Sequence, residues 1–416
     1  MNIFKTSILT AVATGARLLS GFIVMKLVAI QAGPEGVAQF GQFMSLTALL
    51  VVFAGGGIGP GVVKYLAEYK GDDYKVKNLL KSAFTFTLIA SLVMCLLVLL
   101  LSERITEWLF GSDDFQWLIV ILSFAQILVA LHNLAISVVN GMMDVKRLAF
   151  IHMCGAAVGV VLPLYLGAFY KLQGILLAFL LAQASLILIS FFVYKKSGYF
   201  SWAHIGWLLR KDESIRLARF SLMTLTSALL APLVQIAVRN HLADHFTWEH
   251  VGYWQAVSKV SEAYLLFITM AISVYYLPKL SALERRADLI DEIKSAYIYL
   301  MPLVSLLALS IYLCRDPITA ILFSRDFESA NYLYAPQLVG DILKIASFIF
   351  SYMMLAKAMT RTFICSELLF SSMYYALVVL LTAQFGLIGA MYAFVVNYLL
   401  YLIFTATVVF VFVRRA

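Results

Sequence analysis

Charged residues are scarce in this sequence. Only 13% of its 416 residues are Asp, Glu, Lys or Arg, whereas 62% are hydrophobic. Soluble domains carry about 25% charged residues, so this scarcity excludes a soluble fold. The long apolar runs found instead are typical of a protein that crosses the membrane many times.

Cysteine is also scarce and carries no recognisable chemistry. The four cysteines stand singly, mostly within apolar runs, without a CxxC pair or a Cys/His cluster. This pattern indicates neither a metal site nor a disulfide framework, so we expect four buried thiols. They are Cys95, Cys154, Cys314 and Cys365.

A nucleotide-binding motif is absent as well. The glycine-rich run at residues 55–61, GGGIGPG, does not end in the GK[ST] of a phosphate-binding loop. Because the run falls inside an apolar stretch, it predicts a bent and locally loosened helix. We therefore expect no ATP hydrolysis by this chain and no cofactor.

Apolar runs of the length that a bilayer requires recur along the whole chain. They predict an all-α membrane protein with twelve transmembrane helices, near residues 7–31, 36–66, 80–101, 116–140, 148–169, 173–194, 216–240, 249–279, 295–313, 332–356, 362–383 and 387–413. Basic residues gather in alternate connections, so the positive-inside rule predicts that both termini are cytoplasmic. These connections also explain the net charge of +8, and no nucleic-acid partner is expected.

The second half of the chain weakly repeats the first when the two are aligned at an offset of 214 residues. Leu66 falls on Leu280 without a gap, and Gly174 falls on Gly389 after a slip of one residue. The order of spans, loops and basic helix ends repeats in the same way. A repeat with the same orientation in both halves predicts two lobes related by an axis along the membrane normal.

The repeat sets the expected domain boundaries. Residues 1–196 form the predicted N-terminal lobe of six helices, and residues 214–416 form the predicted C-terminal lobe of six helices. Residues 197–213 are the linker, and their aromatic and aliphatic side chains predict a segment at the cytoplasmic interface. A ligand site is expected between the lobes.

Two predicted spans of the second half contain charged residues of both signs. Lys259 and Glu262 lie in the eighth span, and Asp341 and Lys344 lie in the tenth. A charge at the centre of a spanning helix costs roughly 2.5–3.5 kcal/mol on insertion scales, so it needs partners or a wet cavity. Each pair has i,i+3 spacing, so a local ion pair is the alternative interpretation. We favour a cavity because even a neutral pair gains most by facing water.

Three further basic residues lie within predicted spans. Arg17 has no acidic neighbour in the sequence, and its guanidinium group suits phosphate oxygens. Lys26 and Arg239 lie nearer the periplasmic edge, where snorkelling to the interface explains them. Together these charges predict a central basic cavity for an anionic ligand, with Glu262 and Asp341 as candidates for ion coupling.

The chain resembles the Wzx-type flippases of the multidrug/oligosaccharidyl-lipid/polysaccharide exporter superfamily in residues 32–43, 216–283 and 335–361. The likeness extends over essentially the whole chain, although no short diagnostic motif carries it. The resemblance implies a two-lobed transporter of the bacterial inner membrane rather than an enzyme. It also carries over four matching positions, Lys259, Glu262, Asp341 and Lys344.

The resemblance further implies a substrate and a mechanism. An undecaprenyl-pyrophosphate-linked oligosaccharide is expected to move from the cytoplasmic to the periplasmic leaflet by alternating access. We expect an O-antigen unit as cargo, with lipid III flipping or cation-coupled drug export as alternatives. A membrane glycosyltransferase or polymerase is disfavoured because the outward loops are short. The expected partners are the bilayer, an O-antigen polymerase and a chain-length regulator, and the chain itself is expected to be a monomer.

Overall fold

The computed structural model describes residues 3–208, 211–283, 285–357 and 359–415, and every regular element within these ranges is helical. Eight of the described helices are long and apolar enough to cross a membrane. The predicted all-α fold of a multi-pass membrane protein is therefore confirmed. The count of twelve spans and their grouping into two lobes of six helices remain predictions.

The chain divides into two compact units. The first contains Met1–Ala32 and Gln39–Ile236, and the second contains Gly33–Ala38 and Ala237–Ala416. This division differs from the lobe boundaries drawn from the repeat, because the units follow packing rather than sequence similarity. The lobe boundaries therefore remain a prediction.

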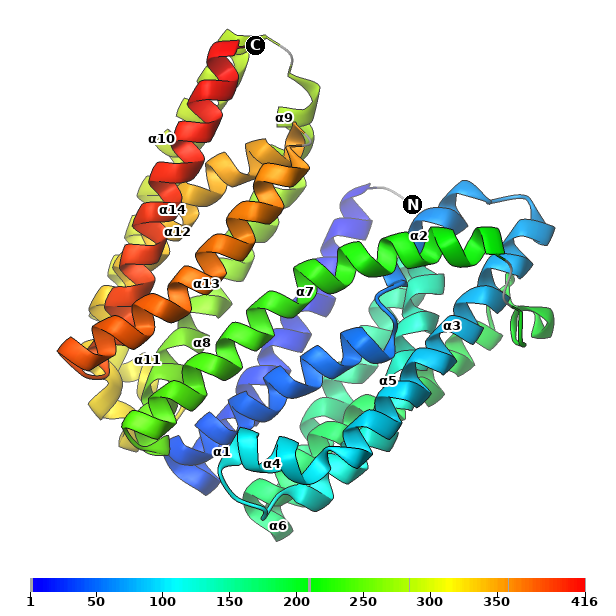
Figure 1. Ribbon diagram of the computed structural model, residues 1–416, viewed down its shortest axis with the longest axis horizontal. Coiled ribbons are helices and arrows are strands. Elements are labelled where there is room, and N and C mark those ends of the chain that lie inside the picture. Colours follow the sequence, from blue (N-terminus) through cyan, green and yellow to red (C-terminus); the bar gives the residue numbers. More distant parts are fainter. Residues whose placement is uncertain (1–2, 209–210, 284, 358, 416) are drawn as a thin grey trace. The chain divides into compact units, whose positions relative to one another are not determined.

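Helix α5 is the central element of the first unit. This unit contains α1 (Ile3–Ala54, without residues 33–38), α2 (Gly59–Glu68), α3 (Asp73–Leu100), α4 (Ser102–Phe110), α5 (Gln116–Gly141), α6 (Val145–Lys195), the 3₁₀ turn η1 (Trp202–His204) and the first part of α7 (Lys211–His245). Helix α5 packs against α2, α3, α4 and α6 (Figure 1). Leu66, Leu79 and Leu217 are fully buried in the core that joins α2, α3 and α7.

Two of the longest helices are each two helices joined at a sharp break. In α1 the break is at Gly33, with φ 61° and ψ −161°, and in α6 it is at Lys171, with φ 49° and ψ −134°. Glycine adopts a positive φ at no steric cost, and Pro34 follows it directly. Both breaks fall where the apolar pattern predicts a connection between two spans. The chain therefore reverses within what is otherwise continuous helix.

The glycine-rich run at residues 55–61 interrupts the helical path, as predicted. Helix α1 ends at Ala54 and α2 begins at Gly59. A Cβ at Gly57, which has φ +64°, would lie 3.0 Å from the carbonyl oxygen of Ser221. The absence of a side chain thus lets the turn approach the backbone of α7.

The aligned glycines Gly174 and Gly389 occupy the same local environment. A Cβ at Gly174 would lie 2.2 Å from the carbonyl oxygen of Leu166, and one at Gly389 would lie 2.2 Å from that of Leu381. In both cases the carbonyl belongs to the residue eight positions earlier, so the glycine permits the same tight return between two helices. This match supports the repeat at these two hairpins.

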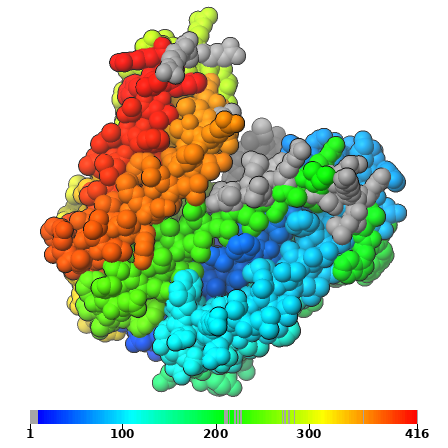
Figure 2. Space-filling view, viewed as in Figure 1, coloured from blue at the N-terminus to red at the C-terminus, as the bar shows by residue number. Residues whose placement is uncertain are grey.

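Helix α12 is the most buried of the eight candidate spans that the described residues contain. The second unit contains the last part of α7, α8 (Trp248–Ala271), the π-helical η2 (Ile272–Tyr276), α9 (Leu277–Ala282), α10 (Arg286–Leu313), α11 (Arg315–Leu322), the 3₁₀ η3 (Arg325–Leu333), α12 (Tyr334–Ala356), α13 (Thr360–Phe385) and α14 (Ile388–Arg415). Helix α12 packs against α8, α10, α13 and α14. Helices α13 and α14 lie side by side on the surface of this unit (Figures 1 and 2).

The predicted eighth span is a helix with an interruption. Helix α8 gives way to five π-helical residues, Ile272–Tyr276, before α9. Such π-helical turns are rare and occur frequently at functional sites. At the other end of α8, a Cβ at Gly252 would lie 2.0 Å from the carbonyl oxygen of Pro34. This close approach explains why residues 33–38 belong to the second unit.

The linker after α6 folds back onto α3. The backbone N–H of Leu208 donates to Thr85 Oγ1 at 3.0 Å, and the Thr85 hydroxyl donates to the carbonyl of Gly206 at 3.3 Å. Burial lowers the pKa of His204, and a hydrogen bond of 3.0 Å joins its Nδ1 to the Tyr194 hydroxyl. Trp202 is largely exposed, as is usual at a membrane surface. Its position at the cytoplasmic interface remains a prediction.

Candidate functional site

Lys259 and Glu262 form an ion pair on one face of α8. Lys259 Nζ lies 2.6 Å from Glu262 Oε2, and the two side chains are 26% and 47% exposed. This is the local i,i+3 pair that was the alternative to a cavity site. It does not make the two residues inaccessible, because Glu262 remains about half exposed. Glu262 also lies within the electrostatic field of Lys344 and Arg239.

Asp341 is fully buried and its carboxylate accepts hydrogen bonds from uncharged groups. The hydroxyl of Ser261 donates to Oδ1 at 2.6 Å, and the hydroxyl of Tyr264 donates to Oδ2 at 2.8 Å. The side-chain amide of Gln337 donates to Oδ1 at 3.0 Å. Three donors on one carboxylate compensate for much of the cost of its burial. These contacts connect α8 to α12.

Lys344 lies one turn from Asp341 but forms no ion pair with it or with any other carboxylate in the described ranges. Its ammonium group lies among three aromatic rings instead. Lys344 Nζ is 5.5 Å from the ring centroid of Tyr398, 5.8 Å from that of Phe394 and 5.9 Å from that of Phe348. Aromatic faces attract a cation without neutralising its charge. Lys344 therefore has no direct ion-pair partner in the described ranges, although Asp341 and Glu262 lie within its electrostatic field.

Arg239 on α7 is buried within the second unit, with 2% of its surface exposed. Its Nε–H donates to Gln255 Oε1 at 2.8 Å, and its guanidinium lies 5.8 Å from the ring centroid of Trp254. The snorkelling interpretation is wrong for this residue, because a snorkelling side chain extends to water. Arg239 instead joins α7 to α8 and contributes a buried positive charge.

Glu367 on α13 is an acidic residue of this region that our sequence analysis did not identify. The hydroxyl of Tyr401 donates to Glu367 Oε1 at 2.9 Å and lies 3.2 Å from Ser351 Oγ. Glu367 also lies within the electrostatic field of Lys344. With it, the cluster of the second unit contains three cations, Arg239, Lys259 and Lys344, and three carboxylates. The second unit alone therefore lacks the predicted excess of positive charge.

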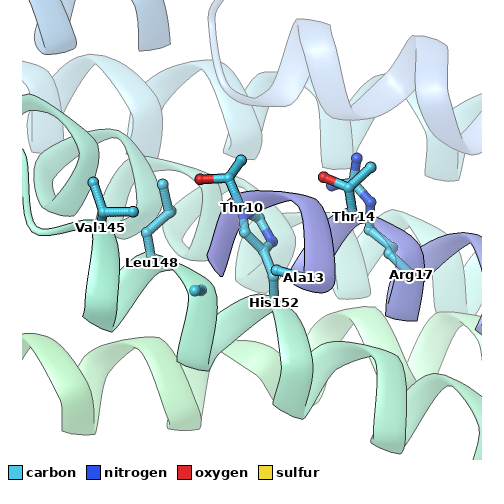
Figure 3. Close-up of a pocket in the computed structure, with 8 residues that line it drawn as sticks. Thr10, Ala13, Thr14, Arg17, Val145, Leu148 and His152 are labelled. Carbon is cyan, nitrogen blue, oxygen red and sulfur yellow. The ribbon is translucent and has the colours of Figure 1, made fainter. Parts of the chain in front are cut away.

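Arg17 and Lys26 belong to the first unit. Arg17 is exposed on α1 and lines a cavity of about 120 Å³ together with Thr10, Thr14 and, from α6, His152 (Figure 3). Within the described residues no ion pair involves Arg17. Lys26 is half-buried. Among the residues predicted for a central cavity, the structure therefore brings together those of the second unit.

Solved structures with a similar fold are membrane transporters. A multidrug resistance transporter of the MATE family and the MOP superfamily, in an inward-facing conformation, matches 95% of this chain and 94% of its own, with a TM-score of 0.80 and 13% identity. The lipid II flippase MurJ, in an inward closed conformation, matches 96% of this chain and 87% of its own, with a TM-score of 0.75 and 18% identity. At these identities the likeness establishes the fold alone.

Sequence relatives identify the family. The chain is 31% identical to the lipid III flippases of Escherichia coli (strain K12) and Shigella flexneri, over 419 residues that span 100% of both chains. The polysaccharide biosynthesis protein family matches residues 36–332. The chain belongs to this family, and the predicted membership of the Wzx-type flippases is confirmed. The expectation of a transporter rather than an enzyme is confirmed by the same relatives.

Proposed function

We propose that this protein flips an undecaprenyl-pyrophosphate-linked oligosaccharide from the cytoplasmic to the periplasmic leaflet of the bacterial inner membrane. The full-length relatives that are named flippases support this proposal. The observation that carries it is the environment of Lys344, a membrane-embedded cation with aromatic neighbours and no carboxylate partner among the described residues. A pyrophosphate group would supply the anion that this lysine lacks.

The charged residues would have different roles in binding the headgroup. Lys344 and Arg17 would contact phosphate oxygens, since neither has an ion-pair partner in the described part of the chain. Lys26 of the first unit would add positive charge. Arg239 would act as a buried positive charge behind Gln255. The polyprenyl tail would remain in the lipid while the two lobes alternate between inward and outward access.

Glu262 and Asp341 would have different roles in any coupling to an ion gradient. Glu262 is about half exposed, so an ion or proton from water could reach it. Asp341 is fully buried behind three hydrogen-bond donors, so its carboxylate is the less accessible of the two. We therefore propose Glu262 as the first candidate for ion coupling. Transport that does not respond to proton or sodium gradients would remove this role.

The cargo we favour is lipid III, the unit used for enterobacterial common antigen. Our sequence analysis placed an O-antigen unit first, but the full-length relatives are lipid III flippases. An O-antigen unit has the same undecaprenyl pyrophosphate and differs in the glycan, so it remains the second candidate. The chain would act as a monomer without a cofactor and with both termini in the cytoplasm. An O-antigen polymerase and a chain-length regulator would be its partners only in the O-antigen case.

Complementation tests the function and the cargo together. The chain is expressed in cells that lack their lipid III flippase and, separately, in cells that lack their O-antigen flippase. We expect restored surface glycan in the first strain, with an expression-matched Arg17→Ala/Lys344→Ala variant as the inactive control. Restoration in the second strain alone would assign the O-antigen unit as cargo. If neither strain regained surface glycan at normal protein levels, the proposed function would be wrong.

A further inference from the structure

The first unit contains a cavity of about 480 Å³ that is lined by residues from both ends of α6. The break at Lys171 folds this helix into a hairpin, so its two ends lie side by side. The guanidinium of Arg147 donates to the carbonyl oxygen of Lys196 at 3.2 Å and joins them directly. The positive-inside pattern predicts that this end of the hairpin is cytoplasmic.

Two lysines give this cavity an uncompensated positive charge. The one acidic side chain that lines it, Asp144, pairs with Arg147 and accepts the backbone N–H of Arg147 at 3.2 Å. Lys146 and Lys196 also line the cavity, and both are exposed. Neither forms an ion pair with a carboxylate in the described ranges. The cavity therefore offers two free ammonium groups to an anion.

The remaining surface of the cavity is apolar and accessible. Phe150 and Phe192 line it, and each is 55% exposed. Lys196 Nζ lies 4.3 Å from the ring centroid of Phe192, so charge and apolar surface are adjacent. A free phosphate ion would use the lysines and leave both rings in contact with water. The phosphate of a phospholipid would contact the lysines, and its acyl chains would pack against the two rings.

We propose that this cavity binds the headgroup of an anionic phospholipid of the surrounding membrane. The lipid would contact both ends of the α6 hairpin and hold them at the membrane surface. Basic pockets between spanning helices on the cytoplasmic side bind anionic headgroups in other membrane proteins. This cavity shares no lining residue with the cavity of Arg17. Its occupancy is therefore measured as lipid binding, independently of transport.

Native mass spectrometry of the full-length protein tests the proposal. The protein is purified in detergent and titrated with phosphatidylglycerol or, as the zwitterionic comparison, phosphatidylethanolamine with the same acyl chains. A basic residue near an anionic lipid strengthens binding about fivefold, so Lys146→Ala/Lys196→Ala should weaken phosphatidylglycerol binding more than about tenfold. The matched control, Lys70→Ala/Lys77→Ala, removes two exposed lysines elsewhere in the first unit and should leave binding unchanged.

Further measurements distinguish a membrane phospholipid from the transported substrate and from free phosphate. Phe150→Ala/Phe192→Ala keeps both lysines and should also weaken phosphatidylglycerol binding, because the acyl chains lose their contact surface. Undecaprenyl phosphate should bind the Lys146→Ala/Lys196→Ala variant as it binds the unmodified protein. The proposal is overturned if Lys146→Ala/Lys196→Ala and Lys70→Ala/Lys77→Ala weaken phosphatidylglycerol binding equally. It is also overturned if the protein binds both phospholipids equally, or if inorganic phosphate displaces the bound lipid. A loss confined to undecaprenyl phosphate would assign the cavity to the substrate instead.

Discussion

Helices α8 and α12 each carry a lysine and an acidic residue three positions apart, yet the two pairs behave differently. On α8, Lys259 and Glu262 contact each other at 2.6 Å. On α12, Asp341 accepts hydrogen bonds from three uncharged groups and Lys344 lies among aromatic rings. Spacing alone therefore does not decide whether two opposite charges neutralise each other. The neighbours that other helices supply decide it.

This difference indicates that Asp341 and Lys344 have different roles, which the sequence alone did not distinguish. Asp341 is satisfied by its donors and joins α8 to α12, which is a structural role. Lys344 is half-buried and forms no ion pair in the described ranges, so we propose that it pairs with an anion of the substrate. Lys259 already has a carboxylate partner, so it has less to gain from a pyrophosphate. We therefore expect Lys344 to matter more for transport than Lys259.

The largest expected effect is that of Lys344→Ala. A hydrogen bond to a charged group contributes about 1.5–3 kcal/mol, so transport should fall at least about tenfold. Lys344→Arg keeps the charge and should retain most of the activity. The measurement is the amount of surface glycan in complemented cells at matched protein levels. Full activity of Lys344→Ala would mean that this lysine does not contact the substrate.

Asp341→Ala should have the largest effect on stability. The substitution leaves the Ser261, Tyr264 and Gln337 donors without their acceptor, which costs about 1–3 kcal/mol for each donor. Asp341→Asn is the matched control, because its amide oxygen can still accept a hydrogen bond. Thermal unfolding of the purified variants measures the difference. Equal melting temperatures for the two variants would show that the carboxylate does not organise these donors.

Gln255→Ala removes one hydrogen bond to a charged group and should destabilise the second unit by about 1.5–3 kcal/mol, less than the loss of three donors' acceptor in Asp341→Ala. The buried guanidinium of Arg239 loses the acceptor of its Nε–H but keeps its other contacts. Gln255→Glu supplies an acceptor of similar shape and should restore the melting temperature. A stability unchanged by Gln255→Ala would show that Arg239 does not depend on this bond.

Glu262→Gln should have the smallest effect on stability, less than about 1 kcal/mol, because partly exposed ion pairs contribute little. The exchanged pair Lys259→Glu/Glu262→Lys keeps the contact with its charges reversed and serves as the control. Both are compared by thermal unfolding. If Glu262→Gln lowered the stability as much as Asp341→Ala does, the ion pair on α8 would stabilise the fold as much as the buried carboxylate does. The proposed difference between the two helices would then be wrong.

Much of the fold follows from local signals in the sequence. The lengths of the apolar runs predict the helices, and Gly33 with Pro34 marks the break in α1 because these residues tolerate it. The break at Lys171 was predicted from the end of an apolar run, although nothing in the residue itself favours a positive φ. The π-helical turn at Ile272–Tyr276 was not predicted. Its cause lies in packing rather than in the local sequence.

The site was predictable where its contacts are local. The ion pair of Lys259 and Glu262 was the alternative interpretation of their i,i+3 spacing, and it forms, whereas the same spacing gives no ion pair between Asp341 and Lys344 in the described ranges. The partners of Asp341 could not be predicted, because Ser261 and Tyr264 lie 80 and 77 residues away in the chain. Glu367 could have been found, since it is the one charged residue in the predicted span 362–383.

The most direct test of the contrast between α8 and α12 is the affinity of the full-length protein for undecaprenyl pyrophosphate. The dissociation constant is measured in nanodiscs for the unmodified protein, Lys344→Ala and Lys259→Ala. Because one charged contact is worth about 1.5–3 kcal/mol, we predict a rise of about tenfold or more for Lys344→Ala. For Lys259→Ala we predict a rise of less than about threefold, since its partner Glu262 already offsets its charge. Equal rises for the two variants, or an unchanged affinity of Lys344→Ala, would contradict the assignment of Lys344 as the anion-binding residue.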